Sequence, residues 1–338
     1  MRVGLSFDLK EALVRGNCAP GKTPDDMFEE YDSPTTIGYI QRAIEGLGHS
    51  TVRLGGGPEL MRNILDEKVD IVFNIAEGRG TYRSREAQVP SILEMLDIPY
   101  VGSDPECLAV CLDKHLTKKL LKMEGIPTPD WRLINNQREL TETDWKGFPF
   151  PAIVKPSFEG SSKGIHANSL VDSAAQAAAT VGEMLETYRQ PVLVEQFIDG
   201  DEVTVGMLGN SPVKVLGMMK IIPRKQSNRF VYTVEVKRDW KNLVDYECPA
   251  HLKEATTKKI AEYSRKTFEM LGCRDFSRID FRVSADGIPY MLEINPLPGL
   301  GDYSDLIIMA VKLGWKHEEL IASVFNAALE RYPLCVHV

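Results

Sequence analysis

Short apolar runs alternate with segments of helical periodicity along residues 1–103. Apolar runs bounded by turn residues are typical of buried strands, and apolar residues that recur every three or four positions are typical of helices. Because strands that alternate with helices form parallel sheets, this part is expected to be an α/β domain. The polar stretch at 8–35 interrupts the pattern and is expected to be a long loop, a kind of segment that often carries function. The expected strands are 2–7, 50–54, 69–76 and 99–101, and the expected helices are 36–47, 59–66 and 87–96.

The remaining chain divides into two further parts by the same criteria. Residues 104–190 predict one helix from 104 to 124, a short strand at 152–155 and an alanine-rich helix at 173–189. We therefore expect three domains, 1–103, 104–190 and 191–338. The last part predicts strands at 192–196, 202–208 and 213–219, a polar segment at 223–246, a helix at 252–271, a hairpin at 278–295 and two terminal helices.

The hairpin at 278–295 carries two carboxylates. Asp286-Gly287 is a strong signal for a two-residue turn between alternating strands. Counting outward from that turn places Asp280 opposite Glu293 and Arg278 opposite Asn295. Since strand side chains alternate between faces, Asp280, Glu293 and Asn295 are expected on one face. The other face is expected to hold Ile279, Phe281, Val283, Tyr290, Leu292 and Ile294.

Two carboxylates directly opposite each other repel, and a bound cation reverses that repulsion. Three oxygen ligands on a rigid hairpin suit Mg²⁺ or Mn²⁺. The alternative is a solvated hairpin face on which Arg282 neutralises its neighbours. The hairpin pattern alone leaves both interpretations open.

Composition narrows the class of protein. The chain has 338 residues, 40 basic and 48 acidic, for a net charge of −8, which argues against a general nucleic-acid surface. It contains no apolar run long enough for a membrane span and no secretory signal, so a cytoplasmic protein is expected. None of the six cysteines forms a Cys-x-x-Cys pair, and Cys107 and Cys111 fall on one helix face, so reduced core thiols are expected rather than a metal site. The cysteines are Cys18, Cys107, Cys111, Cys248, Cys273 and Cys335.

Two segments are candidates for binding phosphate. Residues 16–23 match the P-loop pattern and include Lys22, but no clear strand precedes them, and Pro24 disfavours helical geometry at the residue before it. Residues 155–164 follow a clear strand and combine glycines with Ser161 and Ser162, so their backbone can wrap an anion. Lys155 at the strand end is placed to reach a phosphate. We prefer the second segment and expect the first to be a loop.

From about residue 36 onward the chain resembles the D-alanine–D-alanine ligase family, which has the ATP-grasp fold. The segment that begins Lys155-Pro156-Ser157 resembles that family's serine loop over the phosphates. Asp113-Lys114 resembles the lysine at the α-phosphate. The stretches around Glu195, Arg278 and Glu293 resemble the nucleotide hinge and the metal-binding strands. The resemblance implies an N-terminal parallel α/β domain and two α+β lobes that clasp ATP.

The resemblance also implies roles for individual residues. ATP and two Mg²⁺ (or Mn²⁺) ions would be the cofactors, and Asp280, Glu293 and Asn295 would bind the metal, in agreement with the hairpin count. Arg278 would stabilise an acyl phosphate and a tetrahedral intermediate, with Ser161, Lys237 and Glu29 beside it. The residues implied to bind ATP are Lys114, Lys155, Ser161, Ser162, Glu195, Gln196, Phe197, Ile198, Glu202 and Lys237. Those implied to bind substrate are Arg278, Gly299, Ser304, Asp305 and Arg238.

Several positions depart from the family pattern. Lys237-Arg238 replaces a Lys-Tyr pair over the first substrate, and Glu29 is the nearest match to an N-terminal glutamate that the tyrosine would contact. Arg238 is either a solvated residue of a basic lid or a substrate contact. Asp305 falls where the family has an apolar residue, and is either a first-turn helix residue or a contact to a cationic or hydroxylated substrate side chain. Glu77-Gly78 replaces a His-Gly pair. Arginine for tyrosine and aspartate for an apolar residue change the charge where the substrates would sit, which argues against a simple pair of D-alanines.

We interpret the sequence as an ATP-dependent carboxylate–amine ligase that joins two amino acids. Its partners would be small-molecule amino acids and a second copy in a homodimer, without nucleic acid or membrane. Three alternatives remain: a small-molecule kinase on the same fold, a P-loop nucleotide switch that uses Lys22, and a catalytically silent ATP-binding regulator.

Overall fold

The N-terminal part of the computed structural model forms a parallel four-stranded sheet, as its alternating pattern predicts. The structure describes residues 1–12, 24–225 and 229–333. β1 (Arg2–Ser6) lies between β2 (Ser50–Gly55) and β3 (Ile71–Asn74), and β4 (Tyr100–Val101) extends the sheet beyond β3, with every pair parallel. The helices between these strands are α2 (Pro34–Gly46), α3 (Pro58–Asp66), the 3₁₀ turn η1 (Arg85–Ala87) and α4 (Gln88–Met95).

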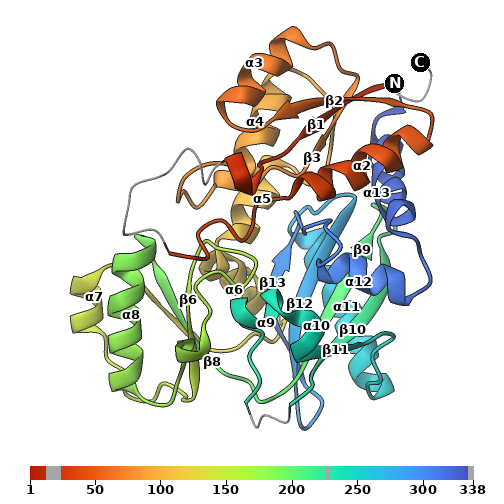
Figure 1. The fold of residues 1–338 in the computed structure, drawn as a ribbon. Helices are drawn as coiled ribbons and strands as arrows, with labels where there is room; N and C mark the ends of the chain where they lie inside the picture. Colours follow the sequence, from red (N-terminus) through yellow and green to blue (C-terminus); the bar gives the residue numbers. More distant parts are fainter. Residues whose placement is uncertain (13–23, 226–228, 334–338) are drawn as a thin grey trace.

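The far end of the chain completes the core of this sheet. Helix α13 (His317–Arg331) lies beside α2 at the sheet (Figure 1). Ile37 and Ile40 of α2 share one buried cluster with Val324 and Phe325 of α13. A single core therefore joins residues from the first and last of the three expected domains. The domain limits at 103 and 190 stay a prediction.

The middle of the chain forms an antiparallel sheet with the strand order β5-β8-β6-β7. The alanine-rich helix α8 (Ala174–Tyr188) buries Val181 and Leu185 against this sheet. The strands are β5 (Trp131–Ile134), β6 (Ala152–Pro156), β7 (Leu170–Val171) and β8 (Val192–Gln196), and the remaining short elements are α7 (Gln137–Glu142) and η2 (Ala167–Ser169).

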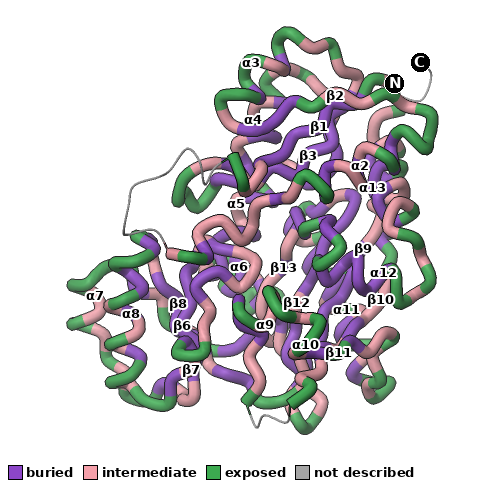
Figure 2. Tube along the Cα trace, viewed as in Figure 1, coloured by how far each residue is buried: buried purple, intermediate pink, exposed green. Residues whose placement is uncertain are grey.

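A second antiparallel sheet, of order β11-β10-β9-β12-β13, fills the C-terminal part. Burial is concentrated on these strands and on the packed sides of the helices (Figure 2). Parallel and antiparallel sheets with helices confirm the mixed α/β class. The strands are β9 (Gly200–Leu208), β10 (Lys214–Pro223), β11 (Val244–Glu247), β12 (Phe276–Ser284) and β13 (Pro289–Asn295), and the helices are α9 (Val234–Arg238), α10 (Trp240–Leu243), α11 (Glu254–Met270) and α12 (Asp305–Lys312).

The single helix expected from 104 to 124 is wrong, because the chain breaks at Asp113. Helices α5 (Pro105–Leu112) and α6 (Lys114–Met123) lie on either side, and Asp113 has extended backbone angles. Its carboxylate accepts a hydrogen bond from the Leu116 N–H at 3.1 Å and so caps α6. An aspartate that satisfies a free backbone donor competes with helix continuation. The break turns Lys114 inward, where it is buried.

The predicted hairpin register holds, although its turn differs from the prediction. Asp280 pairs with Glu293 and Arg278 with Asn295, as expected. The loop holds three residues rather than two, since Ser284 bonds to Ile288 around it, and Gly287 takes a positive φ of 86°. A bulge after Asp280 restores the register. It also reverses the faces near Tyr290, so Met291 enters the core and Leu292 does not.

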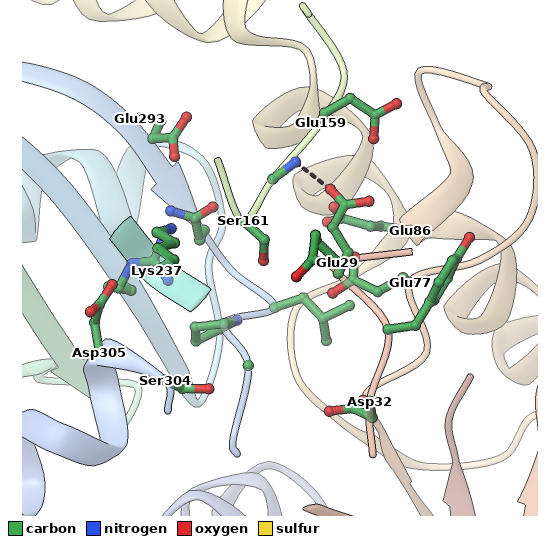
Figure 3. Close-up of a pocket in the computed structure, with 18 of the residues that line it drawn as sticks. Glu29, Asp32, Glu77, Glu86, Glu159, Ser161, Lys237, Glu293, Ser304 and Asp305 are labelled. Atoms are coloured by element: carbon green, nitrogen blue, oxygen red, sulfur yellow. Dashed lines mark hydrogen bonds between the residues drawn. The ribbon is translucent and has the colours of Figure 1, made fainter. Parts of the chain in front are cut away.

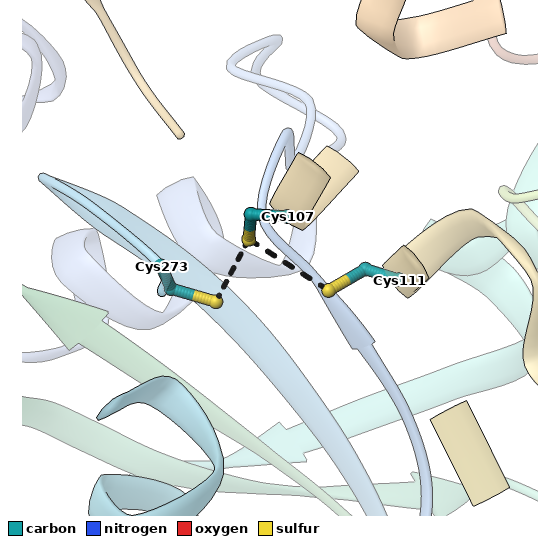
Figure 4. A group of neighbouring side chains, drawn as sticks. All are labelled: Cys107, Cys111 and Cys273. Carbon is teal, nitrogen blue, oxygen red and sulfur yellow. Dashed lines mark hydrogen bonds between the residues drawn. The ribbon is translucent and has the colours of Figure 1, made fainter. Parts of the chain in front are cut away.

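Three of the expected core thiols meet in the interior (Figure 4). The sulfur of Cys107 lies 3.9 Å from that of Cys111 and 3.5 Å from that of Cys273, and all three residues are buried and free of disulfides. The shared helix face of Cys107 and Cys111 is confirmed. Cys18 and Cys335 lie outside the described residues.

The polar segment at 223–246 contains more structure than its pattern indicates, because α9, α10 and β11 lie within it. Elements this short show too few positions for a clear period. No helix in the described parts of the chain combines the length and apolar character needed to cross a membrane.

Candidate functional site

Two adjoining pockets lie at the junction of the three sheets. A large cavity of about 390 Å³ is bounded by the N-terminal segment 29–33, the serine loop and the turn after β13. A smaller inter-sheet pocket of about 90 Å³ lies between the two antiparallel sheets. The two share Tyr232, Lys237, Glu293 and Asp305, so a ligand in one can contact a ligand in the other at these side chains.

Every residue that the sequence singled out for the preferred site lines one of the two pockets. The inter-sheet pocket is lined by Lys155, Ser162, Glu195, Gln196, Phe197, Ile198, Glu202, Lys237, Asp280, Glu293 and Asp305. The large cavity is lined by Glu29, Lys114, Ser161, Lys237, Arg238, Arg278, Glu293, Asn295, Gly299, Ser304 and Asp305. Lys22, which belongs to the alternative P-loop segment at 16–23, lies outside the described residues.

Glu195 anchors two lysines in the inter-sheet pocket. Its carboxylate oxygens lie 2.8 Å from Lys155 Nζ and 2.7 Å from Lys118 Nζ, and all three side chains are buried. Burial alone would raise the pKa of Glu195, but the two lysines together lower it. Burial also lowers the pKa of Lys118, to about 8. Lys118 was not expected from the sequence, where it is one of many helix lysines.

The opposite end of this pocket holds Glu202 and Arg282. Arg282 Nη1 lies 3.3 Å from Glu202 Oε2, and its guanidinium covers the Phe197 ring at 4.4 Å. Burial raises the pKa of Glu202 to about 7, even though Arg282 opposes the rise. A carboxyl group that is neither strongly acidic nor solvated is suited to hydrogen bonding with hydroxyls.

The predicted metal residues lie together on β12 and β13. Asp280 accepts hydrogen bonds from Thr204 Oγ1 at 2.5 Å, from Asn295 Nδ2 at 3.2 Å and from Arg278 at 2.9 Å.

Lys114 Nζ lies 3.3 Å from Glu293 Oε2. Burial disfavours the Glu293 charge, but Lys114, Lys155 and nearby cations outweigh it and lower its pKa to about 2. Two carboxylates and an amide oxygen are hard donors, and this set fits Mg²⁺ or Mn²⁺.

The N-terminal segment holds the serine loop in place. The Gly164 N–H donates to Asp26 Oδ2 at 2.7 Å, and the Gly160 N–H donates to Glu30. Between them, Ser161 and Ser162 take positive φ values of 49° and 58°. Asp26 and Glu30 were missed by the sequence analysis, because they lie in the long polar insertion where no local pattern marks them.

Arg238 lines the large cavity and is held by two acids of the N-terminal segment rather than standing free in solvent. Its guanidinium lies 2.8 Å from Glu29 Oε1 and 2.6 Å from Asp25 Oδ2. Glu29 is also 3.0 Å from Lys10 Nζ. An ion pair therefore stands where the family pattern would place a tyrosine and a glutamate.

Asp305 is a first-turn helix residue, as one interpretation expects, and its contact with a substrate side chain stays a prediction. It lies in the first turn of α12, after Ser304 at the N-cap, and it is also buried in the wall of both pockets. The Tyr232 hydroxyl donates to Asp305 Oδ1 at 3.2 Å. Burial raises the pKa of Asp305, and Arg278 and Lys237 oppose that rise.

Figure 3 shows how charge is distributed across the large cavity. Glu29, Asp32, Glu77 and Glu86 come from the N-terminal side, whereas Lys237, Ser304 and Asp305 come from the C-terminal side. Asp32 and Glu86 were not singled out by the sequence analysis. Neither belongs to a recognisable spacing, and they line the same cavity only because the N-terminal sheet brings its loops to one edge.

Comparison with known proteins agrees with this geometry. The family model "D-ala D-ala ligase C-terminus" matches residues 120–326. The D-alanine–D-alanine ligase of Aquifex aeolicus (strain VF5) is 36% identical over 85% of this chain and 92% of its own. An uncharacterised protein of Sinorhizobium fredii is 33% identical over 87% of each chain. The crystal structure of D-alanine–D-alanine ligase from Bacillus anthracis complexed with ATP matches over 99% of both chains, with a TM-score of 0.75 and 23% identity.

The fold is thus the ATP-grasp fold, and the chain is of the class of ATP-dependent ligases that form a carbon–nitrogen bond. Within that class, it belongs to the D-alanine–D-alanine ligase family.

Proposed function

We propose that this enzyme joins two amino acids by activating the carboxylate of one as an acyl phosphate. The observation that carries the proposal is the meeting of the inter-sheet pocket and the large cavity at Lys237 and Glu293. A nucleotide in the first and amino acids in the second would bring a γ-phosphate and a carboxylate together at that point.

The reaction would proceed in two displacements. A carboxylate oxygen of the first amino acid attacks the γ-phosphorus of ATP, a new O–P bond forms, and the bond to the β-phosphate breaks to release ADP. The amine of the second amino acid then attacks the acyl carbon, the C–N bond forms, phosphate leaves, and the amine loses a proton. Arg278 is proposed to stabilise the charge that develops at the acyl group in both steps.

ATP would be held from both sheets. Lys114 and Lys155 would neutralise phosphate charge, and the serine loop, with Ser161 and Ser162, would cover the phosphates and exclude water. The backbone of residues 195–198 would hold adenine, because the Glu195 side chain is engaged by two lysines, and Glu202 would hold the ribose hydroxyls. Two Mg²⁺ (or Mn²⁺) ions at Asp280, Glu293 and Asn295 would supply further positive charge between the phosphates.

The charged residues around α9 support substrates other than a simple pair of D-alanines. Lys237 would reach the phosphates, and Arg238 with Glu29 would close the cavity through their ion pair, in place of a neutral tyrosine contact. Gly299, Ser304 and Asp305 would bind the second amino acid. We further propose a cytoplasmic homodimer whose partners are small molecules, without nucleic acid.

The test is phosphate release from ATP with Mg²⁺ across single and paired D- and L-amino acids, with Glu293→Ala as the blank. Turnover that requires particular amino acids and yields ADP and a peptide by mass spectrometry is the expected result. A stable phosphorylated amino acid without a peptide would instead identify a kinase. ATP binding without turnover on any amino acid would contradict the proposal.

A further inference from the structure

Three carboxylates form one wall of the large cavity, and we call Asp32, Glu77 and Glu86 the acidic wall. They come from separate segments: the loop before α2, the turn after β3 and the 3₁₀ turn η1. Figure 3 shows them on the N-terminal side of the cavity, facing the side that carries Lys237. Asp32 is only 7% exposed and Glu86 only 8% exposed, whereas Glu77 is half-buried, and all three line the cavity.

The acidic wall differs from the other acids of the same cavity in lacking partners. Glu29 pairs with Lys10 and Arg238, and Glu30 pairs with Arg85. Glu159 pairs with Lys163 at 2.8 Å. Across residues 1–12, 24–225 and 229–333, by contrast, no cation lies within ion-pair distance of the acidic wall and no donor bonds to its carboxylates. Buried carboxylates without partners are costly, and proteins keep them chiefly where a ligand supplies the missing charge.

The surroundings of the three carboxyl groups make their charged forms unfavourable. Burial raises the pKa of Glu86 to about 7, with Glu30 adding to the rise and Arg85 and Lys114 opposing it. Burial also raises the pKa of Asp32 to about 8, with Asp8 adding to the rise. The pKa of Glu77 is raised by burial and by Glu86, Glu30 and Asp32, against Arg85. A bound cation would relieve all three groups at once.

The spacing of the acidic wall suits an organic cation better than a bare metal ion. A metal needs its ligand atoms close together. Among the described residues, the groups of three or more whose ligand atoms lie within 4.8 Å of one another do not include the acidic wall. They are Cys107, Cys111 and Cys273, and Asp25, Asp26 and His166. An ammonium or guanidinium group on a flexible chain can instead reach several separated carboxylates through its diverging N–H donors.

Aromatic rings add to the fit for such a cation. Tyr31 and Tyr303 line the same cavity. The Tyr31 hydroxyl donates to the carbonyl of Gly78, the residue after Glu77, at 3.5 Å. Burial raises the pKa of both tyrosines, with Asp32 adding to the rise at Tyr303 and Glu30 at Tyr31. Ring faces attract ammonium and guanidinium groups.

We propose that the acidic wall is a specificity site for a cationic side chain, so that one of the two amino-acid substrates is a basic amino acid. This inference rests on the proposed ligase function. An amino acid with a neutral side chain brings only its α-ammonium, and its side chain offers the acidic wall no charge. A basic amino acid brings a second positive charge, while its carboxylate meets Arg278 and Lys237 across the cavity.

The experiment compares matched substrates in the full-length enzyme with ATP, Mg²⁺ and alanine as the second amino acid. Lysine is paired with norleucine, and arginine with citrulline, each as D and L forms. The expected kcat/KM for the basic member is at least about tenfold higher, as charge-assisted hydrogen bonds of about 1.5–3 kcal/mol imply. Asp32→Asn and Glu86→Gln should erase the preference, whereas Glu59→Gln, an exposed acid outside the cavity, should keep it.

A binding measurement without ATP separates affinity from turnover. Lysine should raise the melting temperature of the wild type more than norleucine does, and should not do so in Asp32→Asn. If norleucine and citrulline are turned over as well as lysine and arginine, or better, and peptide still forms, the proposal of a basic substrate is overturned. The proposed ligase function would then still stand. ATP binding without turnover on any amino acid would overturn both.

Discussion

The guanidinium of Arg238 lies 2.8 Å from the carboxylate of Glu29, although 209 residues separate them in the chain. The pair joins helix α9 to the N-terminal segment, and both residues line the large cavity. We call this ion pair the latch between α9 and the N-terminal segment. Because the pair is partly exposed, salt should weaken the attraction between its two charges.

The first prediction concerns this latch. Arg238→Ala should lower kcat/KM for the amino acids by up to about fivefold, because partly exposed ion pairs contribute about 0–1 kcal/mol. A double-mutant cycle with Glu29→Gln isolates the coupling between the two side chains. Additive effects of the two changes on kcat/KM would show that the latch does not act as a pair. The coupling should also weaken in high salt.

The second prediction concerns the metal residues. Glu293→Ala and Asp280→Asn should each reduce turnover by roughly 10²-fold or more, since each removes a charge from the phosphate-transfer site. Removal of Mg²⁺ with a chelator should have a similar effect, reversed by adding Mg²⁺ or Mn²⁺. Asp286→Asn is the matched control, because Asp286 is an exposed acid at the turn of the same hairpin. Full activity of Glu293→Ala would rule out the metal assignment.

The third prediction concerns the anchor of the serine loop. Asp26 is fully buried and accepts bonds from the Gly164 N–H at 2.7 Å and the Tyr188 hydroxyl at 2.9 Å. Asp26→Ala should lower the free energy of unfolding by about 2–4 kcal/mol, because it leaves two buried donors unpaired. Tyr188→Phe removes only one of these bonds and should cost about 1 kcal/mol. Urea unfolding measures both, and a cost for Asp26→Ala no larger than that for Tyr188→Phe would contradict this account.

The fourth prediction concerns pH. Burial, reinforced by Asp8, raises the pKa of Asp32 from 3.8 to about 8, so between these values the native protein holds a proton that the unfolded chain has lost. Its contribution to stability is therefore complete below about pH 4 and is lost as the pH rises to about 8, at up to about 1.4 kcal/mol per pH unit. Asp32→Asn cannot titrate and should show a shallower decline. Urea unfolding at about pH 5, 6.5 and 8 tests this, and parallel declines in the two proteins would refute it.

The fifth prediction concerns the thiols. Cys107, Cys111 and Cys273 are buried and should resist alkylation in the native protein, because a reagent cannot reach them without local unfolding. Cys248 is less buried and should react sooner. Peptide mass spectrometry after timed iodoacetamide treatment reads each site separately. Rapid native-state labelling of Cys273 would show that this core opens far more readily than its packing indicates.

Sequence analysis could single out the proposed nucleotide and metal residues, which line the two pockets, because each lies in a short contiguous pattern. The glycines and serines after Lys155 mark an anion loop, and alternation on the hairpin places Asp280 opposite Glu293. That register was obtained with an incorrect turn. The three-residue loop shifts the strands by one position, and the bulge after Asp280 cancels the shift.

What the sequence by itself determined is thus local: the strands and helices, the anion loop and the paired hairpin acids, all set by backbone periodicity and nearby side chains. The tertiary structure alone decided the acidic wall, the Arg238–Glu29 latch and the use of Asp26 and Glu30 to hold the serine loop. Asp32, Glu77 and Glu86 have no shared spacing, and they come to line one cavity only when three loops meet at one edge of the parallel sheet. Contacts of this kind depend on how separate sheets pack against each other, and packing is a property of the whole fold rather than of any segment.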